Sequence, residues 1–233
     1  MRKKLNISND ELFLDLLRNK ITMVEKPRFN TIDAISEDIK NNINGDIVEC
    51  GSWRGGMSIY LANTFYDRKI WVCDSFCGFQ PLNNAMYRYD KHDRHDENFD
   101  RNHPHAIHGG MSIIANIEDV KNNFNKYGFN DENIIFLEGY VKDTLNPLNC
   151  NIENISLLRI DVDSYSATLE VLTYLYDKVS VGGYIIFDDS ALYECQDAIQ
   201  EFTKQRNINM ELTYPSGIKG VNLDENGGYF KKI

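Results

Sequence analysis

Two hydrophobic runs in the sequence each end in a pair of carboxylates. The run ISLLRI leads into Asp161 and Asp163. The run VGGYIIF leads into Asp188 and Asp189. If both runs are neighbouring parallel strands, their carboxyl ends lie at the edge where open α/β sheets bind ligands. Asp161, Asp188 and Asp189 are then expected to converge, with Asp163 just beyond its strand.

Carboxylates that are packed together repel one another, and some of them take up protons unless a cation neutralises the group. An all-oxygen ligand set suits Mg²⁺ best, with Ca²⁺ or Mn²⁺ as alternatives. A structural alternative is that the acids cap the helices that follow, expected at 165–178 and 192–205. Asp163 or Ser164 would cap the first helix, and Asp189 or Ser190 the second. Capping accounts for one acid at each turn, whereas the sequence has two.

A second candidate site is the segment 46–56, DIVECGSWRGG, which is typical of a buried strand, a glycine-broken turn and a helix start. A following strand, KIWVCD, ends in Asp74, and an acid there can bind ribose hydroxyls. The turn lacks GxGxxG, and Glu49 precedes its first glycine by two residues. This pattern suits a cofactor with an amino-acid end and no pyrophosphate, such as S-adenosylmethionine. The alternative is an ordinary strand–turn–helix with packing glycines.

The composition narrows the class of protein further. The chain has 233 residues and a net charge of -10, which argues against nucleic acid or an anionic membrane as its main partner. Its five cysteines are an odd number and do not indicate a disulfide framework. No apolar run follows the basic residues near the N-terminus, so we expect neither a signal peptide nor a membrane span. The sequence predicts a cytoplasmic protein.

Strands and helices alternate along most of the chain, which predicts an α/β fold with a doubly wound, mostly parallel sheet and a late antiparallel hairpin. One helix is expected to start near Ser8 or Asn9, and a second to run from the cap candidate Thr31 to about Asn42. We find no linker, so residues 1–233 are expected to form one domain. Seven strands are predicted, at 46–50, 69–74, 134–138, 156–161, 184–188, 209–214 and 227–232.

The segment 75–110 breaks this alternation, because it shows neither a helical nor a strand period. A long irregular insertion in a compact domain is usually functional or mobile. We interpret it as a lid over the cofactor and substrate, with a disordered surface loop as the alternative. Its histidines match no compact zinc spacing, although one of them could act as an acid or base. They are all five of the chain: His92, His95, His103, His105 and His108.

Several segments together resemble a known family, the class I sugar O-methyltransferases typified by the macrocin and mycinamicin enzymes. They appear in the family's order and span residues from about 46 to 202. The matching pieces are VECGSWRGG (48–56), VCDSFCGF (72–79), LEGYVKDTL (137–145), LLRIDVDSYSAT (157–168), LYDKVSVGGYIIFDD (175–189) and EF (201–202). Ser190 departs from the pattern, since the family usually has an aromatic residue there.

The resemblance implies a Rossmann-like methyltransferase fold, S-adenosylmethionine as cofactor, bound Mg²⁺ and a sugar or sugar-nucleotide acceptor. It implies metal ligation by Asp161, Asp188 and Asp189, with Asp163 as the candidate base. Residues 1–45 are then expected to cover the site or to form homo-oligomer contacts. The predicted cofactor-binding residues lie in the glycine-broken turn and after the second strand: Glu49, Gly51, Ser52, Arg54, Gly55, Asp74 and Ser75.

Three other functions are compatible with parts of the sequence. Asp161-Val-Asp163 has the DxD form that metal-dependent glycosyltransferases use, but these enzymes do not need the ECGSWRGG turn followed by Asp74. A non-catalytic binding or assembly subunit on a methyltransferase scaffold would gain nothing from a cluster of carboxylates, which costs stability. An NAD-dependent enzyme is disfavoured because GxGxxG is missing. The sequence therefore favours a metal-dependent O-methyltransferase.

Overall fold

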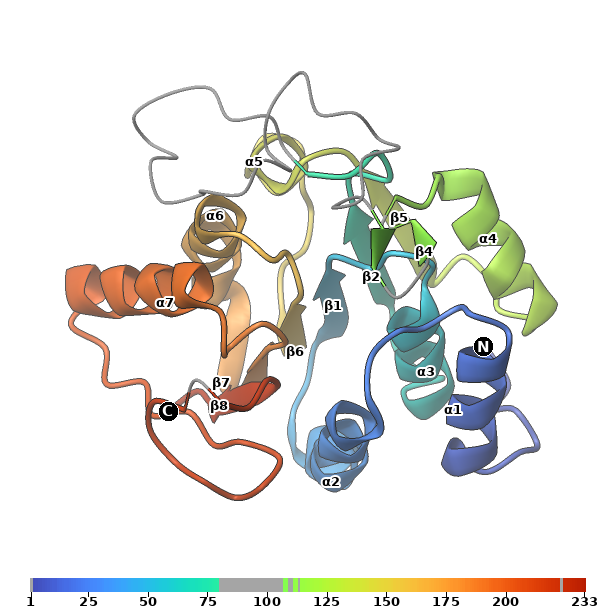
Figure 1. Ribbon diagram of the computed structural model, residues 1–233, viewed down its shortest axis with the longest axis horizontal. Coiled ribbons are helices and arrows are strands. Elements are labelled where there is room, and N and C mark those ends of the chain that lie inside the picture. Colours follow the sequence, from blue (N-terminus) through green and yellow to red (C-terminus); the bar gives the residue numbers. More distant parts are fainter. Residues whose placement is uncertain (1, 80–106, 109–110, 113, 223) are drawn as a thin grey trace.

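The computed structural model describes residues 2–79, 107–108, 111–112, 114–222 and 224–233 (Figure 1). Helices and strands alternate along most of the chain, as the sequence predicted. The helices are α1 (Asn9–Arg18), α2 (Lys26–Asn42), α3 (Gly56–Thr64), α4 (Ile117–Lys126), α5 (Val141–Thr144), α6 (Tyr165–Leu175) and α7 (Tyr193–Arg206), with a 3-10 turn at Tyr176–Lys178. The strands are β1 (Asp46–Cys50), β2 (Ile70–Asp74), β3 (Ile107–His108), β4 (Met111–Ser112), β5 (Ile134–Glu138), β6 (Ile155–Ile160), β7 (Val179–Phe187) and β8 (Gly228–Lys231).

Six strands form the main sheet, in the order β5-β2-β1-β6-β7-β8. All neighbouring pairs are parallel except the last, in which β8 runs antiparallel to β7. The chain leaves β1 toward β2 on one side and later returns to place β6 on the other. Ligands bind at such a switch point, beyond the carboxyl ends of the strands. The fold therefore brings the ends of β1, β2, β6 and β7 together at one edge.

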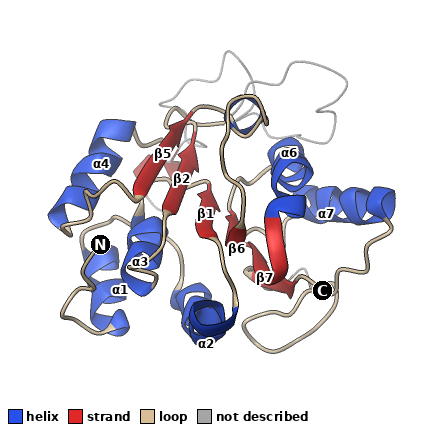
Figure 2. Ribbon diagram, turned by 180° about the vertical axis from the view of Figure 1, so that it is seen from behind, coloured by secondary structure: helices blue, strands red, loops and turns tan. Residues whose placement is uncertain are grey.

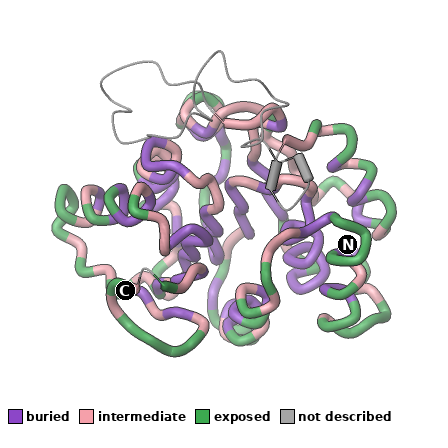
Figure 3. Tube along the Cα trace, viewed as in Figure 1, coloured by how far each residue is buried: buried purple, intermediate pink, exposed green. Residues whose placement is uncertain are grey.

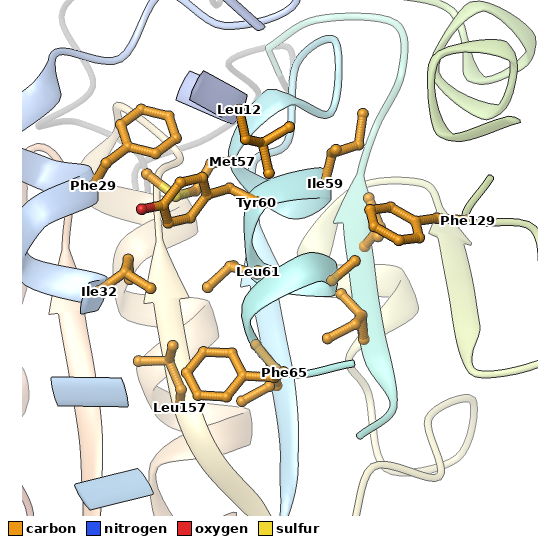
Figure 4. Packing of buried hydrophobic residues seen from close by; sticks show 14 of the residues in the cluster. Leu12, Phe29, Ile32, Met57, Ile59, Tyr60, Leu61, Phe65, Phe129 and Leu157 are labelled. Carbon is orange, nitrogen blue, oxygen red and sulfur yellow. The ribbon is translucent and has the colours of Figure 1, made fainter. Parts of the chain in front are cut away.

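The sheet separates two hydrophobic cores because successive strand residues point to opposite faces. On β1, Ile47 belongs to the core beneath α1–α4, while Val48 belongs to the core beneath α5–α7. The two groups of helices lie on opposite sides of the sheet in both ribbon views (Figures 1 and 2). Figure 3 shows the buried strands between the partly exposed helices, and Figure 4 shows Phe29, Tyr60 and Phe65 packed in the first core.

The N-terminal helices begin where local sequence favours a start. The side chain of Ser8 accepts the backbone N–H of Glu11, whose own carboxylate accepts the N–H of Ser8. This reciprocal capping confirms the predicted start of α1. Helix α2 begins at Lys26, earlier than the predicted cap Thr31, because Pro27 lies in its first turn. Proline suits that position, since its fixed φ is already helical and no N–H is needed there.

The predicted strand at 209–214 is wrong, so the main sheet has six strands instead of seven. Thr213 forms only isolated bridges, with Lys219 and with Tyr229 of β8. Pro215 follows almost at once and has no N–H to continue a ladder. The chain then turns back, as Gly217 donates to the carbonyl of Tyr214 at 2.8 Å. The antiparallel pair at the end of the chain is instead β7 with β8.

The predicted lid lies mostly outside the described residues. This applies to residues 80–106 and 109–110, and so to His92, His95, His103 and His105. His108 lies in the short strand β3, which pairs with β4 in an antiparallel sheet of its own. The lid therefore stays a prediction. Among the described helices, none is both long and apolar enough to cross a membrane.

Candidate active site

A cavity of about 410 Å³ lies at the carboxyl ends of the central strands. Its wall is built from the turn after β1, the end of β2, the residues after β6 and β7, and the segment 21–28 that leads into α2. The volume falls within the usual range for small-molecule sites. Both candidate sites that the sequence indicated, the glycine-broken turn and the carboxylates, therefore line the same cavity.

Gly51 allows the turn after β1 to lie directly against the residue that follows β6. Its φ is +87°, and a Cβ added there would lie 1.5 Å from the carbonyl oxygen of Asp161. The N–H of Asp161 donates to the carbonyl of Cys50 at 2.8 Å, which holds the two segments together. The N–H of Gly51 donates to the carbonyl of Cys73 at 2.8 Å and ties the turn to β2. Glycine is required here both for its conformation and for its missing side chain. The turn and the carboxylate cluster are thus mechanically joined.

Asp74, the predicted ribose ligand, holds the same turn in place. Its Oδ2 accepts the backbone N–H groups of Ser52 at 2.7 Å and Trp53 at 3.0 Å. Its Oδ1 accepts the N–H of Phe76 at 2.8 Å. A carboxylate has about four acceptor positions, so these bonds leave capacity for a ligand hydroxyl. The Asp74 side chain therefore shapes the turn after β1 in addition to lining the cavity.

The other predicted cofactor residues divide into two groups. Glu49, Ser52 and Ser75 line the cavity together with Gly51 and Asp74. Arg54 and Gly55 are not among the described residues that line it. The guanidinium of Arg54 donates to the carbonyl of Lys20 at 3.0 Å and stacks 4.6 Å from the ring centre of Trp53. Arg54 thereby ties the turn to the segment that precedes α2.

Arg159 is a site residue that the sequence reasoning missed. Its side chain is almost wholly buried, and its Nη1 donates to Glu49 Oε1 at 2.5 Å and to Asp161 Oδ2 at 2.7 Å. Its Nη2 donates to Oδ1 of Asp188. A buried guanidinium requires such partners, because an unpaired charge in the interior is very costly. The available signal was an arginine inside the apolar run ISLLRI. The Arg159 guanidinium thus links Glu49 at the end of β1 to both carboxylate pairs.

The carboxylates of Asp161, Asp163 and Asp189 form a cluster in which ligand oxygens lie within 4.8 Å of one another. Asp163 has a φ of +53°, and its backbone N–H donates to Asp189 Oδ2 at 3.0 Å. A positive φ in a residue other than glycine is uncommon and often marks a functional site. The structure therefore brings Asp161 and Asp189 together as predicted, and it places Asp163 beside them.

Asp188 is directed differently from its neighbour Asp189. Its Oδ1 accepts from Arg159, and its Oδ2 accepts from Arg28 at the start of α2. It still lines the cavity, and the Arg159 guanidinium bridges it to Asp161. The predicted metal ligand Asp188 is therefore adjacent to the cluster but is bound to two guanidinium groups.

The electrostatics of the cluster favour a bound cation. Burial raises the pKa of Asp161 well above its usual range, and the nearby charges of Asp188 and Asp163 add to this against the opposing effect of Arg159. Burial likewise raises the pKa of Asp189, together with the charges of Asp163 and Asp161. A divalent cation would remove this repulsion, and the all-oxygen donor set is the one that Mg²⁺ prefers.

The alternative role of the acids as helix caps finds no support. The side chain that caps α6 is Ser164, whose Oγ accepts the N–H of Ala167 at 3.4 Å. The cap of α7 is Leu192, and no side-chain hydrogen bond is made there. Neither Asp163 nor Asp189 is therefore occupied in capping, and both remain available to the cavity.

The fold and the turn after β1 define the class of protein. The structure of the O-methyltransferase NovP matches with a TM-score of 0.74 and 35% sequence identity, covering 91% of this chain and 81% of that one. The architecture is the Rossmann-like fold of methyltransferases, as predicted, with six strands in its main sheet.

Sequence comparison then identifies the family. Residues 3–232 match the model of the macrocin-O-methyltransferase family, TylF. The demethyldecarbamoylnovobiocin O-methyltransferase of Streptomyces niveus is 36% identical over 222 residues, which cover 92% of this chain and 76% of that protein. The mycinamicin III 3''-O-methyltransferase of Micromonospora griseorubida is 31% identical over 217 residues, covering 91% and 78%. The chain belongs to the macrocin-O-methyltransferase family and is a methyltransferase, as the resemblance implied.

Proposed function

We propose that the protein transfers a methyl group from S-adenosylmethionine to a sugar hydroxyl with the help of a divalent metal ion. The observation that carries this proposal is the lining of one cavity. Its wall contains the turn after β1, with Asp74 beside it, and also the acids Asp161 and Asp189. A cofactor on the turn and an acceptor beside the carboxylates would then face each other. Such positioning is a large part of catalysis in a transfer between two substrates.

Glu49, Gly51, Ser52, Asp74 and Ser75 are the residues that would hold the cofactor. Bound there, S-adenosylmethionine supplies an activated methyl group on a positively charged sulfur. Gly51 lets the turn lie against the backbone of Asp161, and Asp74 keeps the turn in shape through the N–H groups of Ser52 and Trp53. Glu49 is fully buried, and its two oxygens accept from Arg159 and from Ser58. We therefore expect it to act as a fixed negative charge below the turn.

Asp161, Asp188 and Asp189 would hold the metal, for which Mg²⁺ is the best fit. Such an ion lowers the pKa of a bound hydroxyl and orients it for reaction. Asp163 is proposed as the base, since it lies beside Asp161 and Asp189 and lines the cavity. It would accept the proton of the acceptor hydroxyl on a carboxylate oxygen as the new O–CH₃ bond forms.

The acceptor is proposed to be a small-molecule sugar, free, nucleotide-linked or attached to a metabolite. A relative from Streptomyces olivaceus, 31% identical over 202 residues, is named as the 4'-O-methyltransferase of a rhamnosyl-tetracenomycin C, which supports this substrate class. We further propose that residues 1–45 help to cover the acceptor. Met23, Val24 and Glu25 line the cavity from that part of the chain.

Thermal unfolding with candidate ligands tests the proposal, because a ligand that binds the native state raises the melting temperature. S-adenosylhomocysteine should raise it, whereas NAD⁺ should not. A glycosyltransferase would instead be stabilised by UDP with Mn²⁺. Methyl transfer should then stop in EDTA and return with Mg²⁺, and undiminished turnover in EDTA would remove the metal from the mechanism.

A further inference from the structure

Two acids that are adjacent in sequence, Asp188 and Asp189, have opposite surroundings. Asp189 lies among other carboxylates, with Asp161 and Asp163 as its neighbours. The side chain of Asp188 is 2% exposed, and each of its oxygens accepts from a guanidinium group. If Asp188 is a metal ligand, as proposed above, a metal ion would share its carboxylate with two positively charged guanidinium groups.

The two guanidinium groups differ in how firmly they are held. Arg159 extends from the central strand β6, is 1% exposed and also binds Glu49 and Asp161. Arg28 lies in the first turn of α2, next to the segment that lines the cavity, and its side chain is 19% exposed. Arg28 can therefore turn toward solvent without breaking the sheet, whereas Arg159 cannot. Arg28 is the group that can be displaced.

The stem of Arg28 also packs at the other side of the site. A Cβ on Gly227 would lie 3.2 Å from Cγ of Arg28, and the N–H of Gly227 donates to the backbone oxygen of Asp188 at 2.9 Å. Asp188 is thus held through its side chain by α2 and through its backbone by the chain before β8. A change in the partner of the Asp188 carboxylate would therefore affect both the start of α2 and the chain before β8.

Electrostatics predict competition between Arg28 and a metal ion. A divalent cation that enters beside Asp161 and Asp189 is attracted by the carboxylates and repelled by the guanidinium of Arg28. Arg28 and the metal ion are both attracted to Asp188, and an ion bound there would weaken the Arg28–Asp188 pair because the two positive charges repel each other.

We propose that Arg28 is a positioning residue that holds Asp188 out of the metal site until a divalent cation displaces it. The proposal rests on the metal part of the proposed function. It makes the Arg28–Asp188 ion pair and metal binding mutually exclusive. By linkage, whatever free energy the pair contributes to the metal-free protein must be lost from the affinity for the metal. Metal binding would also release the start of α2, which forms part of the cavity wall.

The test measures Mg²⁺ binding by calorimetry with S-adenosylhomocysteine present, and the melting temperature with and without saturating Mg²⁺. In Arg28→Met we expect Mg²⁺ to bind about tenfold more tightly, as the competing pair is gone. Without Mg²⁺, the melting temperature of Arg28→Met should be lower than that of the wild type. With saturating Mg²⁺, the two melting temperatures should be equal. Arg28→Gln should behave in the same way, which guards against a folding defect in one variant. Arg28→Lys, which keeps the charge, should bind Mg²⁺ within about threefold of the wild type.

Lys26→Met is the matched control, because Lys26 is also in the first turn of α2 but pairs with Asp10 at 2.5 Å. It removes the same charge from the same helix and should leave Mg²⁺ affinity unchanged. Equal or weaker Mg²⁺ binding in Arg28→Met and Arg28→Gln overturns the inference while the metal assignment stands. If the wild type binds no Mg²⁺ at all, the metal part of the proposed function fails, and the inference fails with it.

Discussion

Gly51 and Asp161 are separated by more than a hundred residues of sequence, yet they lie in direct contact. The backbone of Asp161 occupies the position that a side chain on Gly51 would need. A Cβ on Gly51 would lie 1.5 Å from the carbonyl oxygen of Asp161. The turn after β1 and the segment that carries the clustered acids are therefore built as one unit. A displacement of either segment must move the other.

The first prediction compares two glycines of equal φ. Gly51 and Gly217 both have φ +87°, but a Cβ added to Gly217 would meet no described atom within 4 Å. Gly217→Ala should cost only the left-handed strain, about 1–2 kcal/mol. Gly51→Ala must also push apart two backbone segments, and we expect a loss of more than about 4 kcal/mol. Chemical denaturation measures both, and equal losses would mean that the close approach is not required.

The second prediction concerns Asp74. Asp74→Ala leaves the N–H groups of Ser52 and Trp53 without their acceptor, so the turn should relax. We expect at least about tenfold weaker binding of S-adenosylhomocysteine by calorimetry, which corresponds to about 1.4 kcal/mol. Asp67→Asn, which removes one exposed negative charge, serves as the control and should bind normally. Unchanged affinity in Asp74→Ala would exclude the residue from the cofactor site.

The third prediction separates the proposed base from a proposed ligand. Asp163→Asn should keep Mg²⁺ and cofactor affinity within a few-fold but lower kcat by about 10²–10⁴, the usual contribution of a positioned base. Asp188→Asn should instead weaken Mg²⁺ binding at least about tenfold. The structure makes this comparison necessary, because Asp163 lies in the carboxylate cluster and Asp188 is bound to arginines. A collapse of metal affinity in Asp163→Asn would make Asp163 a ligand.

The fourth prediction is a pH dependence of stability in Arg159→Met. Burial raises the pKa of Glu49 above its usual value, and the charge of Arg159 opposes that shift. Without Arg159 the pKa should rise further, so the folded state holds a proton that the unfolded chain releases. Stability must then fall as pH increases above the ordinary pKa of about 4.3. At about pH 7 we expect a loss of about 3–5 kcal/mol, partly recovered near pH 5.

Arg206→Met controls for this experiment, since Arg206 forms an exposed ion pair with Asp177. Its melting temperature should change little and should show no added pH dependence in the same range. If Arg159→Met lost the same stability at both pH values, the loss of the charge that pairs with Glu49 would not be the cause.

The sequence predicted those parts of the fold that depend on local pattern. The hydrophobic runs at β1, β2, β5 and β6 and the cap of α1 by Ser8 are local features, and the structure has them at or within one residue of the predicted positions. The strand predicted at 209–214 had the right alternation, but whether it joins a sheet depends on partners far away in the chain. Pairing at Thr213 is limited to isolated bridges.

The site residues likewise fall into those that local sequence pattern predicts and those that depend on distant parts of the chain. Gly51, Asp161 and Asp189 could be placed from strand ends alone, because the carboxyl edge of a parallel sheet collects them. Arg159 and Arg28 could not, since their roles arise from ion pairs that span 110 and 160 residues of sequence, to Glu49 and to Asp188. The N-terminal part of the chain carries no motif, yet its residues 21–25 line the cavity and Arg28, in the first turn of α2, supplies a guanidinium that binds Asp188.

The most direct test of the proposed function is an anomalous-scattering map from crystals grown with S-adenosylhomocysteine and Mn²⁺. Manganese takes the oxygen ligands that Mg²⁺ takes and is visible by its own scattering. We predict one peak bound by Asp161, Asp188 and Asp189, with the cofactor product on the turn at Gly51 and Asp74. Bound S-adenosylhomocysteine with no peak at these carboxylates, at Mn²⁺ concentrations that support turnover, would contradict the account.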